Sequence, residues 1–172
     1  MSVVDAASTV VERIAVVIEA RLQAGVADLA RQRYFNRVHR PTRLRDYSPR
    51  DRLIVVEQSD EDEEVGELMK PGNPPSIAFA TLFMVRCYVM PSEKDPTPFD
   101  TYCNQVAGDV TELICRSGTG WHTFDSNAFD AEWLTRIKFA PGDDDGRTGE
   151  GVVVPLLVYY RVSERSPYIK RS

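Results

Sequence analysis

The sequence is poor in the residues that form disulfides or bind metals. Its 172 residues include three cysteines (Cys87, Cys103 and Cys115) and two histidines (His39 and His122). Cys103 and Cys115 are twelve residues apart, which on one helix separates them by about 18 Å, whereas a disulfide needs Cα atoms within roughly 7 Å. Neither histidine has a second histidine or a cysteine at metal-ligand spacing. We therefore expect reduced thiols, synthesis in the cytoplasm, and no metal or cofactor.

Apolar runs long enough to cross a bilayer and an excess of basic charge are also missing. Glu12, Arg13 and Glu19 interrupt the apolar stretch near the N-terminus, so we predict neither a signal peptide nor a membrane span. The formal net charge is −5. That charge argues against a protein that binds DNA mainly through its overall field, although it does not exclude a local basic patch.

Catalytic motifs are weak throughout the chain. Gly118-Thr119-Gly120 follows a predicted helix instead of opening one, so it does not match a phosphate-binding loop. If Gly146 in the run Asp143-Asp144-Asp145-Gly146 took the sixth position of a calcium loop, Pro141 and Val152 would stand where carboxylates are needed. No serine lies in a nucleophile elbow. We do not expect an enzyme.

Two amphipathic helices are predicted by apolar side chains at three-and-four spacing. The first runs from Val3 to about Ala24, with Ser2 as its cap. The second runs from Phe99 to Ser117, with Thr97 as its cap and Pro98 at its first position. Gly108 inside the second helix suggests a close approach to a sheet. Its predicted buried stripe comprises Phe99, Tyr102, Cys103, Val106, Ala107, Val110, Leu113 and Ile114.

The remaining apolar segments predict strands. They are Leu53–Val56, 77–90, Trp121–Phe124 at a sheet edge, Trp133–Phe139, and 151–162, with a polar tail from Ser166. The last two should pair antiparallel, and Pro155 should mark an edge or a bulge. The expected fold is α+β: a mostly antiparallel sheet with two main helices packed on one face, in a single domain over 1–172.

Segments 77–90 and 151–162 are apolar at consecutive positions, and not only at alternate ones. Successive residues of a strand point to opposite faces, so both faces of these strands need cover. Two helices can cover one face. Either loops close the other face efficiently, or a second subunit covers it, and we favour the second subunit.

Charge is segregated into two insertions within the domain. The segment 31–52 has eight arginines against two aspartates and is predicted to be a loop, whereas 57–75 is an acidic loop. Such blocks can be solvated loops, complementary contacts between subunits of a ring, or, for the arginines, contacts to DNA phosphates. We rank subunit contacts above DNA binding, because the acids would repel the same phosphates. The candidate subunit or partner interface is Arg37, Arg40, Arg43, Arg45, Glu61, Asp62, Glu63 and Glu64.

This order of parts resembles the tail terminator proteins of long-tailed bacteriophages. The resemblance spans nearly the full length: an N-terminal helix, a short strand followed by acids, a long apolar strand, the helix from Phe99, a tryptophan-containing strand, and a closing strand that ends Val158-Tyr159-Tyr160-Arg161-Val162. It implies a structural virion protein of the tail neck, assembled in the host bacterial cytoplasm. Such a protein forms a ring, typically a hexamer, that caps the head-proximal end of the tail tube and stops its polymerisation.

The resemblance also implies partners. They are further copies of the chain, the tail tube protein and the head-tail connector, while genome DNA passes through the lumen without specific binding. Two alternatives remain open. One is another neck component, such as a head-tail adaptor, which should bind the connector without capping tubes. The other is a small nucleic-acid-binding factor, for which Arg43→Glu with Arg45→Glu should abolish DNA binding and leave the oligomeric state unchanged.

Overall fold

The computed structural model describes residues 9–26, 37–40, 53–59, 63–65, 76–89, 97–115, 118–139, 149–163 and 166–170. Its helices are α1 (Val10–Val26), α2 (Phe99–Cys115) and the 3-10 helix η2 (Gly118–Thr123). Its strands are β1 (Arg37–His39), β2 (Leu53–Gln58), β3 (Glu63–Glu64), β4 (Ser76–Tyr88), β5 (Asp130–Trp133), β6 (Ile137–Phe139), β7 (Gly151–Ser163) and β8 (Ser166–Lys170).

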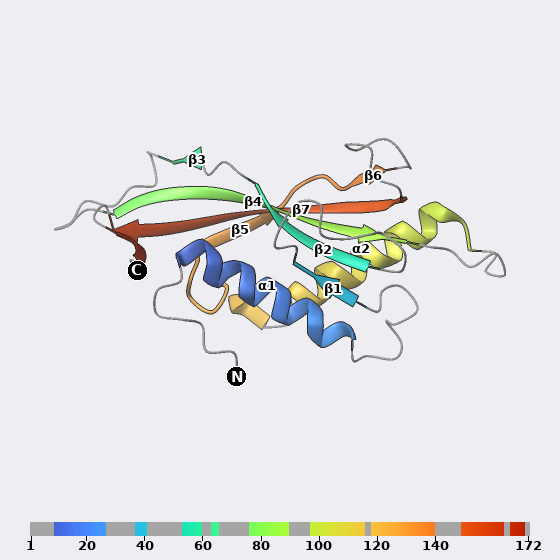
Figure 1. The fold of residues 1–172 in the computed structure, drawn as a ribbon, viewed down its shortest axis with the longest axis horizontal. Coiled ribbons are helices and arrows are strands. Elements are labelled where there is room, and N and C mark those ends of the chain that lie inside the picture. Colours follow the sequence, from blue (N-terminus) through green and yellow to red (C-terminus); the bar gives the residue numbers. More distant parts are fainter. Residues whose placement is uncertain are drawn as a thin grey trace.

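All eight strands form one sheet around the long pair β4 and β7 (Figure 1). These two strands pair antiparallel from Ser76↔Ser163 to Tyr88↔Gly151. The sheet runs in the order β1-β2-β4-β7-β5, with β3 also pairing with β4, and β6 and β8 with β7. Among the strands that the structure describes, β1 and β2 pair in parallel and every other pairing is antiparallel.

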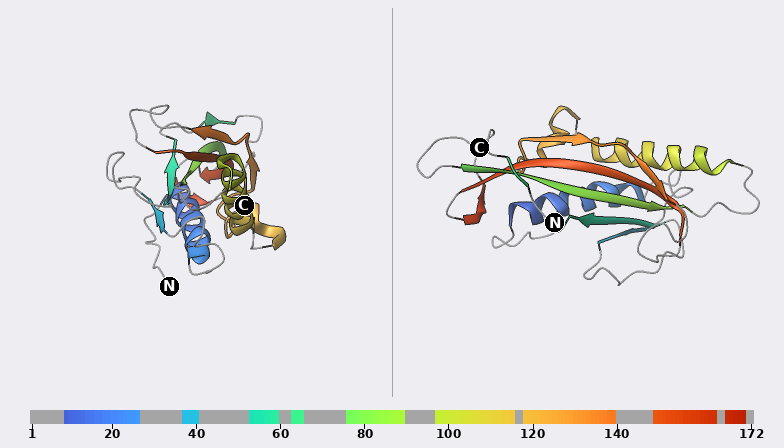
Figure 2. Two further views of the ribbon diagram at one scale, coloured as in Figure 1. Left: turned by 90° about the vertical axis from the view of Figure 1, so that its right-hand side faces the viewer. Right: turned by 90° about the horizontal axis from the view of Figure 1, so that it is seen from above.

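The two α-helices lie side by side on one face of this sheet, which we call the first face (Figures 1 and 2). The main core lies between them and the first-face side chains of the central strands, among them Phe83, Val85 and Leu156, which are all fully buried. The predicted α+β architecture, with both main helices on one face of a mostly antiparallel sheet, is therefore confirmed. The stripe predicted for α2 is also confirmed, because seven of its eight residues are buried and Phe99 packs against the core.

The first helix begins later than its apolar pattern suggests. Thr9 is its cap: the Thr9 hydroxyl accepts a hydrogen bond from the Glu12 amide at 3.2 Å, and the helix starts at Val10. A continuous helix from Val3 is therefore wrong, and Ser2 lies outside the described residues. Gly108 was also misread, because it is exposed and a Cβ built there meets no atom within 4 Å.

Pro155 explains why the predicted strand Trp133–Phe139 is split into β5 and β6. β6 pairs with residues Gly151 to Val153 of β7, and β5 pairs with residues Leu156 to Tyr159 of β7. Pro155 therefore falls in the gap between these two paired stretches. The Pro155 carbonyl accepts a hydrogen bond from the Leu134 amide at 3.1 Å, but the Pro155 ring nitrogen carries no hydrogen and cannot donate one. The ladder is interrupted at that point. The predicted antiparallel pairing with the closing strand is confirmed.

Three further segments differ from their predictions. Trp121–Phe124 is not an edge strand: η2 reaches Thr123, and Phe124, Asp125 and Ser126 follow with φ of 45°, 57° and 67°. Arg21 holds this left-handed turn through the Trp121 carbonyl (2.8 Å) and Asp125 (3.1 Å). β1 lies inside the arginine-rich segment that was predicted to be loop throughout. The C-terminal segment is not a free tail, because β8 pairs with β7.

A candidate interaction surface on the second sheet face

The face of the sheet opposite the helices, the second face, is the candidate site. Strand register places its side chains in rows that cross the sheet. One row joins Val55, Arg86, Val153 and Ile137, and another joins Glu63, Ala80, Tyr159 and Asp130. Such cross-strand neighbours lie about 5 Å apart and contact one another directly. These rows bring together residues that are far apart in the sequence.

One end of the second face is closed within the single chain. Leu53, Val55, Tyr88, Phe139 and Val153 form a second buried cluster there, separate from the main core. The rings of Tyr88 and Phe139 meet edge to face with centroids 5.3 Å apart. The chain's own side chains therefore cover this end of the second face, and cover by a second subunit stays a prediction for the rest of it.

A buried ion pair lies beside that cluster. Arg86 on β4 donates from Nε to Glu57 Oε2 on β2 at 2.7 Å, and both side chains are buried. Glu57 thus belongs to the sheet and not to a solvated acidic loop, which corrects its assignment to the insertion 57–75. Removing one partner of a buried ion pair leaves the other charge uncompensated, so this pair links β2 to β4.

The centre of the second face is apolar and partly open. Leu82, Met84 and Leu157 are half-buried, and Leu134 and Ile137 are 40% and 58% exposed at the β5–β6 side. We call these five residues the apolar band. Leu134 and Ile137 are the two exposed large apolar side chains of the described chain. Leu82 pairs with Leu157, and Met84 pairs with Pro155, whose carbonyl accepts the hydrogen bond from the Leu134 amide. Contiguous exposed apolar side chains on a soluble protein are a common mark of a contact surface.

Acidic side chains border the apolar band on one side. Glu63, Asp130 and Glu132 are exposed on β3 and β5 and surround Tyr159; we call these three the acidic rim. The Tyr159 hydroxyl donates to Glu132 Oε1 at 2.6 Å. This hydrogen bond, with burial and the negative charge of all three acids, raises the pKa of Tyr159 to about 12. Two residues further along β7, the Arg161 guanidinium lies 3.7 Å from the centre of the Phe129 ring. Burial lowers the pKa of Arg161.

The interface residues predicted from the sequence are only partly brought together. Glu63 and Glu64 are exposed on β3, where Glu63 faces Ala80 and joins the acidic rim. Arg40 is bound inside its own chain, because its two terminal nitrogens contact the two Glu12 oxygens at 2.8 and 2.5 Å. That contact lowers the pKa of Glu12 and raises that of Arg40. Arg37 lies in β1, but its side chain is outside the described part, as are Arg43, Arg45, Glu61 and Asp62 entirely.

Sequence reasoning missed Asp130, Glu132 and Tyr159. The segment Asp130–Trp133 carries a usable signal, since its two acids alternate with Ala131 and Trp133, which pack towards the core. However, only the register of β5 and β3 shows that these acids and Glu63 share one face.

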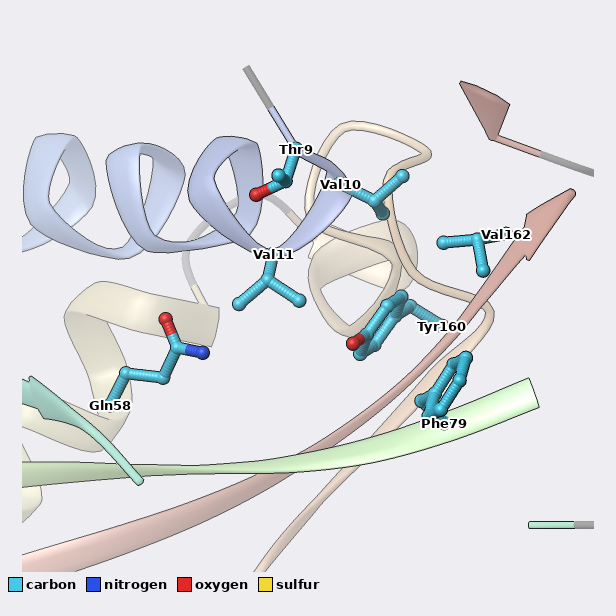
Figure 3. Close-up of a pocket in the computed structure, with 7 residues that line it drawn as sticks. All are labelled: Thr9, Val10, Val11, Gln58, Phe79, Tyr160 and Val162. Carbon is cyan, nitrogen blue, oxygen red and sulfur yellow. The ribbon is translucent and has the colours of Figure 1, made fainter. Parts of the chain in front are cut away.

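A cleft lies on the first face, where α1 begins. Its volume is about 290 Å³, and it is lined by Thr9, Val10, Val11, Gln58, Phe79, Tyr160 and Val162 (Figure 3). The Phe79 and Tyr160 rings stack across β4 and β7 with centroids 5.8 Å apart. Thr9, Gln58 and Tyr160 contribute polar atoms to the lining, and the Thr9 hydroxyl already caps α1. This cleft offers contact area but no group of titratable side chains.

The remaining chemically active side chains are dispersed. Burial raises the pKa of the Cys87 thiol above its ordinary range, and that of Cys103 to about 11. His122 packs edge to face against Trp121, and the His39 side chain lies outside the described part. Within the described residues, no three His, Cys, Asp or Glu side chains gather where they could hold a metal ion. No helix in that part of the chain is long and apolar enough to span a membrane.

The sequence matches no protein-family model and no curated protein.

Proposed function

We propose that this chain is a structural virion protein that acts as a phage tail terminator. Copies of it form a ring of six that caps the head-proximal end of the tail tube, stops tube polymerisation and joins the tail to the head connector. Phage DNA passes through the lumen of the ring without specific binding. The protein belongs to the tail neck and assembles in the host cytoplasm.

One observation carries this proposal: the apolar band on the sheet face that the helices leave open. Leu134 and Ile137 are exposed there beside half-buried Leu82 and Leu157, whereas the other end of the same face is closed by the chain's own side chains. Exposed apolar side chains beside half-buried ones favour contact with another protein surface. The fold supports the same proposal. Its two helices on one face of a mostly antiparallel sheet agree with the order of helices and strands on which the resemblance to tail terminator proteins rests.

The test is the mass of the purified full-length protein by light scattering, with negative-stain images in the presence and absence of tail tubes. We expect a ring, or a monomer that becomes a ring at one end of the tube only. Tubes polymerised with the protein present should be arrested at that end. A stable monomer that ignores tubes would overturn the proposal. Binding to the connector without arrest of tube growth would identify a head-tail adaptor instead.

The double variant Leu134→Asp/Ile137→Asp tests the apolar band itself. Leu134 is 40% and Ile137 58% exposed, so the fold should tolerate the change, but two carboxylates cannot be buried in an apolar contact without a large cost. Ring formation on tubes should fall at least ten-fold. The matched control is Asn104→Asp/Gln105→Glu, which adds the same charge to the exposed side of α2 and should leave ring formation unchanged.

A further inference from the structure

We infer that two copies of this chain associate through the outer edge of β5 and β6, in a twofold contact that places Glu132 of each copy against Arg136 of the other. The exposed apolar side chains at this edge are thus covered by a second copy of the chain. The inference goes beyond the proposed function and does not rest on it, because it concerns free subunits in the absence of a tail tube.

The edge formed by β5 and β6 is open in the part of the chain that the structure describes. Both strands pair with β7 on one side, and no described strand pairs with them on the other (Figure 2). Every residue from Leu134 to Lys138 is exposed, and so are Asp130 and Glu132. Leu134 and Ile137, the two exposed large apolar side chains, both lie on this edge. An open sheet edge with exposed apolar side chains is a surface at which another chain can bind.

The charges along this edge are arranged symmetrically about Leu134. Glu132 lies two residues before Leu134, and Arg136 lies two residues after it. Asp130 and Lys138 lie four residues before and after it in the same way. In a twofold contact, a residue that touches a second residue on the partner is matched by the reverse contact. A twofold axis at Leu134 therefore brings the acids of each copy to the basic residues of the other, and the edge is complementary to itself.

Of these charges, Glu132 and Arg136 carry the contact. Lys138 is already bonded to Asp100 on α2 within its own chain. Arg136 is exposed and makes no hydrogen bond or ion pair with another described residue. Glu132 accepts the Tyr159 hydroxyl on Oε1 at 2.6 Å, but a carboxylate can accept several hydrogen bonds and still bind a guanidinium. Two copies thus form two such pairs around the axis, where Leu134 meets its own counterpart.

Side chains make this contact, and not an added ladder of backbone hydrogen bonds. Trp133 pairs with Leu156, whereas Ile137, four residues on, pairs only three residues back along β7, so the edge bulges between β5 and β6. A bulge with charged side chains beside it hinders continuous pairing between two sheet edges. The contact is small, so the pair should be weak and should form at high protein concentration. It covers Leu134 and Ile137 in free subunits, which must separate before these side chains can enter the proposed ring contact.

The experiment measures the mass of full-length variants by analytical ultracentrifugation over a concentration series, without tail tubes. The unaltered chain should pass from monomer towards dimer as its concentration rises. Glu132→Arg and Arg136→Glu should each weaken the pair by about ten-fold or more, because both attractive pairs around the axis become repulsive. The double variant Glu132→Arg/Arg136→Glu should form the pair again. An equal mixture of the two single variants should do so as well, since every acid then meets an arginine.

The matched control is Gln23→Arg/Ala24→Arg, which makes the same change in charge as Glu132→Arg at exposed positions of α1. It should pair like the unaltered chain. Recovery of the pair on mixing shows that both single variants are folded, and circular dichroism checks each of them independently.

The outcomes separate this inference from the proposed function. Single variants that pair as well as the unaltered chain would overturn the inference, and so would failure of both the double variant and the mixture to recover. An unaltered chain that stays monomeric at the highest concentration, or that forms a ring without tubes, would also overturn it. Arrest of tube growth is measured separately on the same preparations, so the proposed function can stand when the pair is absent and can fail when the pair is present.

Discussion

The substitution Gly151→Ala should strongly destabilise the protein. Gly151 opens β7 opposite Tyr88, and a Cβ built on it lies 1.9 Å from the Cys87 carbonyl oxygen and 3.0 Å from the Phe139 ring. Real Cβ contacts are essentially never shorter than 3.0 Å. The strands must therefore separate locally by more than 1 Å, which overpacks the cluster at this end of the second face and breaks neighbouring hydrogen bonds such as Val89 N to Glu150 O.

Overpacking costs about 1–3 kcal/mol and each lost hydrogen bond about 1 kcal/mol, so we expect a loss of about 3–5 kcal/mol. For a domain of this size that lowers the melting temperature by roughly 6–20 °C. Gly108→Ala is the matched control: its Cβ meets nothing within 4 Å in a helix interior, so it should raise stability by about 1 kcal/mol. Urea unfolding followed by circular dichroism measures both changes. A Gly151→Ala protein within 1 kcal/mol of the unaltered one, taken as about the error of the method, would refute this reasoning.

Three further predictions concern stability and reactivity. Ser126→Gly should raise the unfolding free energy by about 0.5 kcal/mol or more, because φ of 67° disfavours a side chain, whereas Ser126→Ala should bring no gain; equal effects in thermal melts would contradict this. Glu12→Gln should cost at most about 1 kcal/mol at pH 7. Since Arg40 lowers the pKa of Glu12, that difference should shrink as the pH falls below the ordinary carboxyl pKa and through the lowered one, which unfolding curves at several pH values would show. A thiol reagent at pH 8, a round test value, should modify half-buried Cys115 before Cys87, which should react only on unfolding; immediate labelling of Cys87 would contradict its burial and raised pKa.

The sequence was sufficient to predict the elements whose side chains follow a single local period. The stripe from Tyr102 to Ile114 marks α2 because each buried residue lies three or four positions from the next. The apolar runs of β4 and β7 predict strands buried on both faces, which the structure confirms for the end closed by Tyr88 and Phe139. In these elements, local pattern and tertiary packing agree.

The predictions failed where a distant residue decides the local structure. Trp133–Phe139 alternates like one strand, but Pro155 on β7 interrupts its ladder, so it forms two. Trp121 and Phe124 look like strand residues, yet Arg21 from α1 holds their segment in a 3-10 helix and a left-handed turn. Glu57 looks like the first residue of an acidic loop, but in the structure it pairs with Arg86 on the neighbouring strand. None of these partners lies within the local window of the segment that it changes.

The residues of the candidate site also divide into those that the sequence predicts and those that only the structure shows. Glu63 and Glu64 could be found from the sequence because they belong to a run of acids, and the structure describes them as exposed. Asp130 and Glu132 could not be grouped with them, since they lie more than sixty positions further along the chain and become neighbours of Glu63 only through the rows of β3, β4, β7 and β5. Composition can detect a charged segment, but only strand register can show which charges share a face.

The partial closure of the second face also bears on when the proposed ring forms. A stable protein interface buries about 20–30 residues on each side. The chain itself already buries one end of this face, so among the described residues its open part centres on the five residues of the apolar band and the three acids of the rim. A contact of that size depends on charge and should be weak between free subunits in salt. We therefore expect rings to be scarce in solution and to accumulate at the tube end, where the tube aligns neighbouring subunits and raises their local concentration. Light scattering over a concentration series, with and without tubes, distinguishes this from a preformed ring, which would keep its mass on dilution.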